Sequence, residues 1–503
     1  MFPLALIFLL LAGGLYIVNE QHGGILGGEL FAKAPAEESG NNAQDGKAQS
    51  ASSGKDAQDE KKPAKKSRSQ PPSVPDAAKE TAAGAAYWVV AQELPGVEPD
   101  DVRAAYRSKI DPSWAAVHIT APGESPIPSG EDPYYVVFAH KDGGVWKAEN
   151  SIRADEPDYA KNELVPLEGA VPKDLLEYLY QRNVFAAKVP EPEQLDVNRD
   201  ALPKAGPALF PKPVPVLEGV PDSERERVEE AAKQASERIG KYGGIAGLYV
   251  HDLDSGYSYG VRQDEKFFSA SVIKIPVMIS VYRKVDQGDL EFSQEVEIKE
   301  EDWAAGAGWL QWKKAGTKQT VGDLLVLMMT QSDNVATNAL VRTVGGADHV
   351  NEVARSLGAK NTLLRQKLSS ERAAVPDLDN HTTPRDMGLM LEKIARGEAA
   401  RPQSCKYMMD LMYSDKLDWW LDAGLPQGVN SANKAGWLYK VYSDMGIVNA
   451  DGRRYVVSIM SKYGPEDVKE GELLIEDLSR ATWEAQDDET KKPNGGSGDD
   501  SSD

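Results

Sequence analysis

The amino-acid sequence predicts an α+β fold for its largest part, with an antiparallel sheet built from both ends of one domain and a helical insert between them. The stretch GIAGLYVHDLDSGYSYGV has the pattern of a β-hairpin, and GWLYKVYSDMGIVNADGRRYVVSIMSKY indicates strands around a second turn. Between these stretches, residues 268 to about 415 are predicted to be largely helical. An amphipathic helix is predicted at each end of the domain, from SERERVEEAAKQASERIGKY and DVKEGELLIEDLSRATWEA.

Composition divides the chain of 503 residues into six segments. They are a membrane anchor or signal (1–20), a disordered linker (21–83), a small α+β domain of unknown function (84–186), a Pro-rich linker (187–222), the large α+β domain (223–484) and an acidic disordered tail (485–503). Residues 34–83 of the first linker include almost no large apolar residues, so they cannot bury enough surface to offset their chain entropy.

The N-terminus carries an apolar run from Phe2 to Val18. Its length is close to the lower limit for a membrane-spanning helix. A secretory signal peptide normally starts with positive charges, which are missing here. We therefore expect an uncleaved membrane anchor, with a cleaved signal as the second choice, and the bulk of the chain outside the cytoplasm.

The charge balance argues against nucleic acid as a partner, and the spacing of the histidines argues against a metal site. A formal net charge of −22 makes binding to nucleic acid unfavourable. His251, His349 and His381 are far apart, and no H-x-H or H-E-x-x-H pattern occurs, so no metal site is predicted. No cofactor is expected.

The small domain offers no chemistry that can be read from its residues. SWAAVHIT and YYVVFAHKDGGVWKAENSI are β-rich, the second with a KDGG hairpin turn, and VPKDLLEYLYQ indicates a helix. Catalytic residue types do not cluster in it. A positioning or protein-binding role is the default expectation, with the protein partner unknown.

The stretch FFSASVIK places Ser271 and Lys274 one helical turn apart, where residues i and i+3 are neighbours. A helix N-terminus favours negative charge, which helps an alkoxide or oxyanion. A lysine that is partly desolvated can lose its proton and act as a base. The pair is thus a candidate nucleophile and base, and the alternative is an incidental pair with a snorkelling lysine.

Two more motifs follow in order, SDN at residues 332–334 and KAG at residues 434–436. Together with S-x-x-K, their order, spacing and context resemble the serine β-lactamase and penicillin-binding-protein superfamily, closest to class A β-lactamases. The resemblance covers about 260 residues, roughly half the chain. It implies a β-lactamase-like α/β sandwich for the large domain.

The resemblance also implies an acyl-enzyme mechanism. Ser271 would attack the amide carbonyl, and Lys274 would take its proton directly or through water. Ser332 would relay a proton to the leaving nitrogen, and Lys434 would hold Ser332 and attract the substrate carboxylate. The backbone N–H groups of Ser271 and Trp437 would form the oxyanion hole.

The implied substrate-binding residues are Asn334, Ala435 and Gly436. Asn334 would bond Lys274 and the amide side chain of the substrate, and Gly436 would leave room beside the strand. Ala435 stands where the family has Thr or Ser, so a hydroxyl that would bind the substrate carboxylate is missing. A lost hydrogen bond to a charged group is worth ~1.5–3 kcal/mol, which predicts a shifted substrate preference.

The match fails in the loop LLRQKLSSERAAVPDLDNHTTP, residues 363–384. Class A β-lactamases carry there a glutamate that activates the water for deacylation. An ungapped count back from the TTP turn places Lys367 at that position, and a charged lysine cannot serve as this base. Glu371 is the candidate substitute, with Asp377 and Asp379 as alternatives, although each is expected to be a solvated loop charge.

The same count places Arg365 at the family's arginine and Asn380 at the position of its acidic loop-closing partner.

These features predict a serine hydrolase or acyl transferase acting on β-lactams or related cell-wall amides through an acyl-Ser271 intermediate, with slow deacylation. One alternative is a D,D-peptidase, or penicillin-binding protein, acting on peptidoglycan stem peptides. The other, of a different class, is a non-catalytic extracytoplasmic binding or sensor protein.

Overall fold

The computed structural model describes residues 74–94, 96–120, 134–154, 171–180, 190–202, 212–368, 375–414, 420–450 and 452–486. The described helices and strands lie within the compact unit Asp76–Asp503. The predicted anchor, the greater part of the first linker and all but the first two residues of the acidic tail lie outside the described residues. Within the described ranges, no helix has the length and apolar character needed to cross a membrane.

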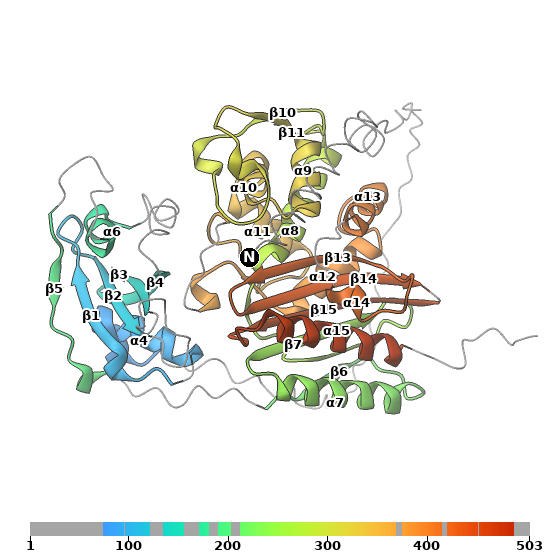
Figure 1. The fold of residues 1–503 in the computed structure, drawn as a ribbon, viewed down its shortest axis with the longest axis horizontal. Helices are drawn as coiled ribbons and strands as arrows, with labels where there is room; N and C mark the ends of the chain where they lie inside the picture. Colours follow the sequence, from blue (N-terminus) through green and yellow to red (C-terminus); the bar gives the residue numbers. More distant parts are fainter. Residues whose placement is uncertain are drawn as a thin grey trace, which may run out of the picture. The chain divides into compact units, whose positions relative to one another are not determined.

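The main sheet has six antiparallel strands in the order β13-β14-β15-β7-β8-β6 (Figure 1). They are β6 (Pro215–Glu218), β7 (Ile245–Asp252), β8 (Ser258–Val261), β13 (Ser431–Leu438), β14 (Val441–Ala450) and β15 (Arg453–Lys462). Strand β7 pairs with β15, with Val250 opposite Val457. Strands from the two ends of the domain are therefore neighbours, which confirms the predicted α+β architecture.

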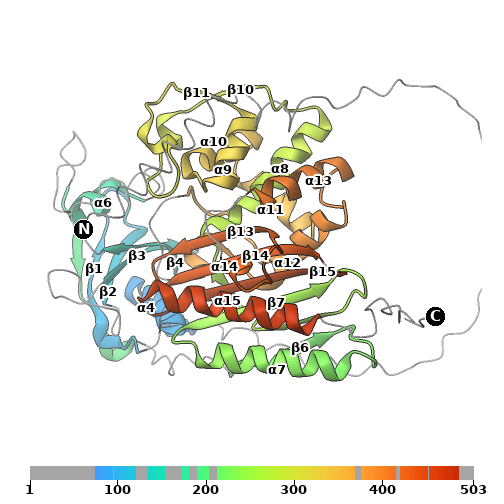
Figure 2. The ribbon, with the colours of Figure 1, turned by 45° about the vertical axis from the view of Figure 1, so that its right-hand side comes forward.

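Two amphipathic helices cover one face of this sheet, α7 (Arg225–Lys241) and α15 (Val468–Ala485). Val228, Ala232 and Ile239 of α7 are buried at intervals of about one or two turns, as expected for a helix that packs along one stripe. They share an apolar cluster with the sheet, α15 and the short α14 (Trp420–Ala423). Figure 2 shows α7 and α15 side by side along the sheet.

The helical insert covers the opposite face. Its helices are α8 (Lys274–Gln287), α9 (Val321–Thr330), α10 (Asn334–Val344), α11 (Ala347–Ser356), α12 (Pro384–Ala395) and α13 (Pro402–Tyr413). Its short elements are β9 (Phe267–Phe268), η4 (Ala270–Ile273), β10 (Glu295–Glu297), η5 (Glu300–Asp302), η6 (Leu310–Trp312), β11 (Lys318–Thr320), η7 (Pro376–Leu378) and β12 (His381–Thr382). Every residue from Lys274 to Tyr282 is buried, so α8 is enclosed by the other helices and the sheet.

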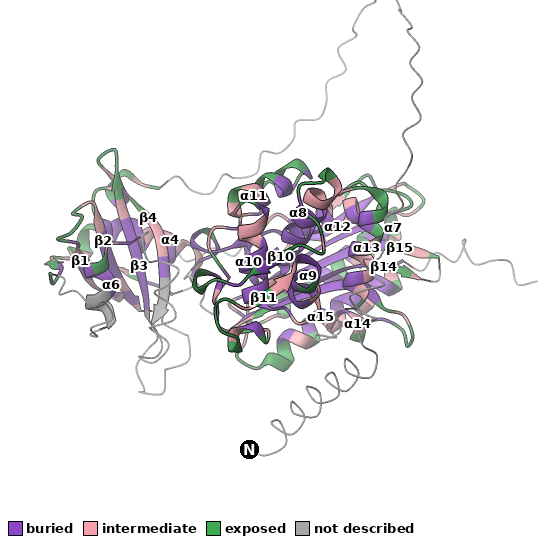
Figure 3. Cartoon of the chain, turned by 90° about the horizontal axis from the view of Figure 1, so that it is seen from above, coloured by how far each residue is buried: buried purple, intermediate pink, exposed green. Residues whose placement is uncertain are grey.

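A second antiparallel sheet, of five strands, forms the small module, which we define as residues 76–202. Its order is β4-β3-β2-β1-β5. Its elements are α3 (Asp76–Lys79), α4 (Ala82–Glu93), η1 (Pro99–Asp101), β1 (Val102–Arg107), β2 (Trp114–Thr120), β3 (Tyr134–Asp142), β4 (Val145–Ala154), α6 (Lys173–Tyr180), β5 (Glu193–Leu195) and η3 (Arg199–Ala201). Helix α4 begins after Thr81, whose hydroxyl accepts the N–H of Gly84 at 3.0 Å. Figure 3 shows the buried strands of both sheets in purple.

Residues 187–222, predicted to be a Pro-rich linker, contribute a strand to each sheet. Strand β5 pairs with β1 in the small module, and β6 pairs with β8 in the main sheet. Both strands are short and lie at a sheet edge. Proline is tolerated at an edge because no central ladder bond is lost there, so a Pro-rich segment can still pair.

Candidate active site

The predicted nucleophile, Ser271, lies in η4, a short 3₁₀ helix directly before α8. This segment follows β9, which pairs with β12, so both flanks of Ser271 are fixed by buried structure. Ala270, the residue before the nucleophile, has a left-handed backbone with φ of 44°. Such strained residues persist only where the surroundings over-determine them, and they cluster at functional sites.

The amine of Lys274 is held by four oxygen atoms. Its Nζ lies 2.8 Å from Ser271 Oγ, 3.0 Å from Ser332 Oγ, 2.7 Å from the Ser332 carbonyl and 2.9 Å from Asn334 Oδ1. The lysine side chain is fully buried. The first two motifs, which are sixty residues apart in sequence, therefore meet at one nitrogen.

These contacts suit a lysine that takes up a proton from a hydroxyl. The Ser332 carbonyl and Asn334 Oδ1 can only accept, so they occupy two N–H groups of the amine. A neutral amine then has its lone pair free to accept the hydroxyl proton of Ser271 or Ser332. A protonated amine donates its third N–H to one of the same hydroxyls, so both states are accommodated without rearrangement.

The SDN turn is held by its aspartate. Asp333 is fully buried, and its carboxylate accepts the backbone N–H groups of Ala336 and Leu310, both at 2.9 Å. The first bond caps helix α10. Ser332 has a φ of 53°, a left-handed conformation that this turn maintains. Asn334 is fixed from its other end because its Nδ2 donates to the Ala305 carbonyl at 2.9 Å.

Strand β13 brings the third motif to the nucleophile. A Cβ on Gly436 would lie 3.1 Å from the backbone nitrogen of Ser271 and 3.0 Å from Val272 Cγ1, so only glycine lets the strand approach this closely. Lys434 and Ala435 are buried in the same strand, whereas Trp437 is 56% exposed. Strand β13 is the edge strand of the sheet, and the N–H groups on its outer side point away from β14.

A cavity of about 520 Å³ opens beside Ser271. Its lining residues are Ala270, Ser271, Gly306, Ala307, Asn334, Gln366, Lys367, Leu368, Asp379, Asn380, Trp437, Leu438 and Tyr439. Ser271, Asn334 and Trp437 were predicted from the motifs. Asp379 was predicted as an alternative deacylation base. Gln366, Leu368 and Tyr439 were not predicted to line the site, and their position within two residues of predicted site residues was the only signal in the sequence.

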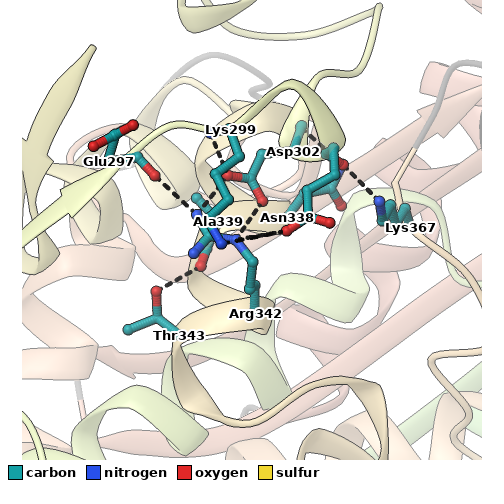
Figure 4. Close-up of polar contacts among 9 residues, drawn as sticks. Glu297, Lys299, Asp302, Asn338, Ala339, Arg342, Thr343 and Lys367 are labelled. Atoms are coloured by element: carbon teal, nitrogen blue, oxygen red, sulfur yellow. Dashed lines mark hydrogen bonds and ion pairs between the residues drawn. The ribbon is translucent and has the colours of Figure 1, made fainter. Parts of the chain in front are cut away.

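Lys367 lines this cavity, but its amine is engaged elsewhere. Its Nζ donates to the backbone carbonyl of Glu301 at 2.6 Å, outside the nucleophile cluster. Figure 4 shows the lysine reaching toward this turn, where Asp302 pairs with Arg342. The loop that begins at residue 363 is therefore tied to the helical insert at this point.

Asn338 of α10 ties the next residue of the same loop. Its Oδ1 accepts the N–H of Leu368 at 2.8 Å, and its Nδ2 donates to the carbonyls of Leu368 and Asp302 at 3.1 and 3.3 Å. All three of these hydrogen bonds are buried. Motif reasoning missed this residue because its role depends on contacts made across thirty residues.

The three predicted candidates for a deacylation base have different positions. Glu371 lies outside the described residues. Asp377 is exposed and forms an ion pair with Lys266. Asp379 is buried and lines the cavity, and its Oδ1 accepts Gln366 Nε2 at 3.1 Å. Among the loop carboxylates that the structure describes, Asp379 is therefore the one beside the nucleophile.

His381 is a structural residue of the loop. Its Nδ1 lies 2.8 Å from the Pro376 carbonyl and 3.1 Å from the Asp379 carbonyl, so this nitrogen carries the hydrogen. Burial, with a further contribution from Lys266, lowers the pKa of His381. The neutral imidazole holds the turn around Asp379. No group of three or more metal-binding side chains occurs in the described ranges.

Gly308→Ala is expected to destabilise the domain strongly. Gly308 has a φ of +98°, and a Cβ there would lie 2.2 Å from Asp333 Cγ. Left-handed strain costs about 1–2 kcal/mol and overpacking a further 1–3 kcal/mol. The matched control is Gly316→Ala, with a φ of +90° and nothing within 4 Å. Thermal unfolding should show a clearly larger fall for Gly308→Ala, and equal shifts would contradict the tight fit over Asp333.

Comparison with known proteins agrees with this geometry. Residues 230–486, just over half of the chain, match the Beta-lactamase enzyme family. A beta-lactamase of Streptomyces albus G is 27% identical over 251 residues, covering 48% of this chain and 80% of that protein. Beta-lactamase SME-1 of Serratia marcescens is 27% identical over 265 residues, covering 52% of this chain and 90% of that protein. The solved structure of PBP-A shows 32% identity, covering 51% of this chain and 95% of that chain, with a TM-score of 0.48. The match across residues 230–486 shows that the chain belongs to the Beta-lactamase enzyme family.

Proposed function

We propose that the protein is a serine acyl-transfer enzyme that reacts with β-lactams or related cell-wall amides through an acyl-Ser271 intermediate, and that it releases the acyl group slowly. The observation that carries this proposal is the fully buried Lys274 amine, 2.8 Å from Ser271 Oγ and 3.0 Å from Ser332 Oγ. Membership of the family supports the same reaction class.

Acylation follows from these contacts in two proton transfers. Ser271 Oγ attacks the amide carbonyl while its proton passes to Lys274 Nζ. The C–N bond of the tetrahedral intermediate then breaks, and the leaving nitrogen takes a proton from Ser332 Oγ, which Lys274 replenishes. The negative charge on the carbonyl oxygen is stabilised by the backbone N–H groups of Ser271 and Trp437.

Slow release follows from the wall of the cavity that faces the nucleophile. The position of the family's glutamate is Lys367, whose amine donates to the Glu301 carbonyl and supplies no base. Asp379 is the carboxylate available in the described part of the loop, and it already accepts bonds from Gln366 and from the backbone N–H of Asn380 at 2.6 Å. Both bonds are accepted by Oδ1, so they occupy lone pairs of that oxygen that a water molecule would otherwise use.

A persistent acyl-enzyme is also what a D,D-peptidase or a sensor would form with a β-lactam. The apolar run at residues 2–18 and the polar linker after it fit a protein tethered to a membrane and working outside the cytoplasm, near the cell wall. Peptidoglycan stem peptides are thus the second candidate substrate.

The test is to mix the full chain, in detergent, with a chromogenic cephalosporin while following both product and intact mass. We expect one burst of product and a lasting mass increase that maps to Ser271. Steady turnover without an adduct would contradict slow release, and neither product nor adduct would contradict reaction with β-lactams. Release of D-alanine from a stem-peptide substrate would favour the peptidase.

Ala435→Thr is expected to raise the second-order rate constant of acylation by a β-lactam about tenfold or more. The reason is that a hydrogen bond to a charged carboxylate is worth ~1.5–3 kcal/mol. Ala435→Val is the matched control, since valine has the shape of threonine without the hydroxyl. Stopped-flow acylation by a cephalosporin would measure both variants. Equal rates for threonine and valine would show that the missing hydroxyl does not limit binding.

A further inference from the structure

The loop beside the nucleophile has a second face, which contacts the small module. Val375 and Leu378 of this loop are almost fully buried and belong to the same apolar cluster as Tyr87 of α4 and Val137 of β3. Tyr463, at the end of β15, packs against the same cluster. The loop and the residue after β15 thus pack into the apolar core of the small module, whereas the main sheet has its own apolar cluster with α7 and α15.

Arg365 makes a polar contact across the same boundary. Its Nη2 donates to the backbone carbonyl of Glu149 in β4 at 2.6 Å and lies 3.5 Å from the Glu149 carboxylate. Asn380 lies opposite Arg365 in the loop. Its Oδ1 accepts the backbone N–H groups of Arg365 and Gln366 at 2.7 and 2.9 Å, and not the guanidinium of Arg365. The arginine charge is therefore turned outward to the small module.

Lys462 makes the third contact. It is fully buried, and its Nζ lies 2.7 Å from Glu93 Oε2 at the end of α4 and 2.9 Å from Glu265 Oε1. Burial alone would lower the pKa of Lys462, but the carboxylates of Glu93 and Glu265 outweigh it and raise this pKa. Removal of one partner from a buried ion pair is costly because it leaves charge uncompensated.

The same loop lines the cavity on its other face, through Gln366, Leu368, Asp379 and Asn380. We propose that the small module is an intramolecular clamp that orders residues 363–368 and 375–380 and so sets the affinity of the Ser271 cavity for its acyl donor. Glu93, Glu149 and Arg365 are positioning residues, because none of them lines the cavity. The expected effect of the clamp on acylation rests on the acyl-transfer function proposed above. The expected effect of the clamp on the order of the loop does not depend on that function.

A looser loop has to be ordered when substrate binds, and this cost appears as weaker binding and not as slower chemistry. The contacts among Ser271, Lys274 and Ser332 are made by η4, α8 and the SDN turn, and the two substituted residues, Glu93 and Arg365, lie outside these elements. The expected signature is a change in substrate affinity without a change in the limiting acylation rate.

The test uses the full chain with Arg365→Ala and Glu93→Gln combined. The matched control combines Arg107→Ala and Glu193→Gln, which removes an ion pair of 3.1 Å inside the small sheet and changes the same charges. With a fluorescent penicillin, we expect the apparent dissociation constant for acylation to rise roughly tenfold in the clamp variant. The limiting acylation rate should stay within about twofold, and the control should match wild type.

Hydrogen exchange of the backbone amides in residues 363–384 is the readout that does not require reaction. We expect faster exchange there in the clamp variant and not in the control. Unchanged exchange together with unchanged affinity would overturn the clamp. Absence of any adduct in the wild-type chain would instead refute the acyl-transfer function, while the exchange result would still decide the clamp.

A second measurement applies even if the clamp variant fails to fold. A protease site inserted between Gly206 and Lys212 allows the wild-type chain to be cut between β5 and β6. The burial of Val375 and Leu378 in the apolar core of the small module predicts that both fragments elute together in gel filtration, with acylation by the fluorescent penicillin unchanged. Separation of the fragments with unchanged affinity for the penicillin would overturn the proposal.

Discussion

Ser271→Ala is expected to abolish covalent reaction with β-lactams. Ser271 is the hydroxyl that combines contact with the Lys274 amine at 2.8 Å with a place in the cavity wall. Without it no acyl-enzyme can form, and the observed rate should fall at least about 10³-fold, to the rate of the uncatalysed reaction. Intact-mass spectrometry after incubation with a penicillin measures this directly.

Ser269→Ala is the control for this change. Ser269 is a buried serine two residues away, and its hydroxyl makes only a long contact of 3.5 Å to the Ala270 carbonyl. The control should form the adduct as wild type does. An adduct that survives in Ser271→Ala would show that another residue is the nucleophile.

Lys274→Met should lower the acylation rate by about 10²–10⁴-fold, the range of a positioned general base. Methionine keeps much of the apolar stem but cannot accept the proton of Ser271. It also leaves the buried Ser332 carbonyl and Asn334 Oδ1 without their shared donor, so the melting temperature should fall as well. The measurement is the limiting rate of acylation by a cephalosporin in stopped flow.

Lys367→Met is the matched control, because it removes an amine from the same cavity wall. That amine donates to the Glu301 carbonyl and does not reach the nucleophile cluster. The acylation rate of this variant should therefore stay close to that of wild type. Equal losses in the two variants would mean that the cavity needs positive charge in general and not a base at Lys274.

The sequence alone was sufficient for the architecture of the large domain and for the contact between its first two motifs. The hairpin and strand patterns predicted a sheet from both chain ends, and β7 does pair with β15. The S-x-x-K, SDN and KAG motifs predicted the family and the contact between Ser271 and Lys274. These features can be predicted from the sequence because periodicity, turns and i,i+3 spacing are local properties of the chain.

The loop between residues 363 and 384 could not be predicted in the same way. Counting from the TTP turn identified Lys367 at the position of the family's glutamate. The count could not predict that the amine of Lys367 donates to the carbonyl of Glu301, a residue 66 positions earlier in the chain. Asp377 and Asp379 are equivalent in sequence, and packing alone buries Asp379 in the cavity wall while it leaves Asp377 exposed.

The sequence by itself determined the family and the motif residues that are the candidates for acyl transfer, because those residues stand in short motifs. The tertiary structure decided what surrounds them: two strands within a Pro-rich segment, and a small module in contact with the loop beside the nucleophile. The bond from Arg365 to Glu149 joins residues 216 positions apart. Such a contact depends on how two apolar faces bury each other, a free-energy balance over the whole fold that no local pattern encodes.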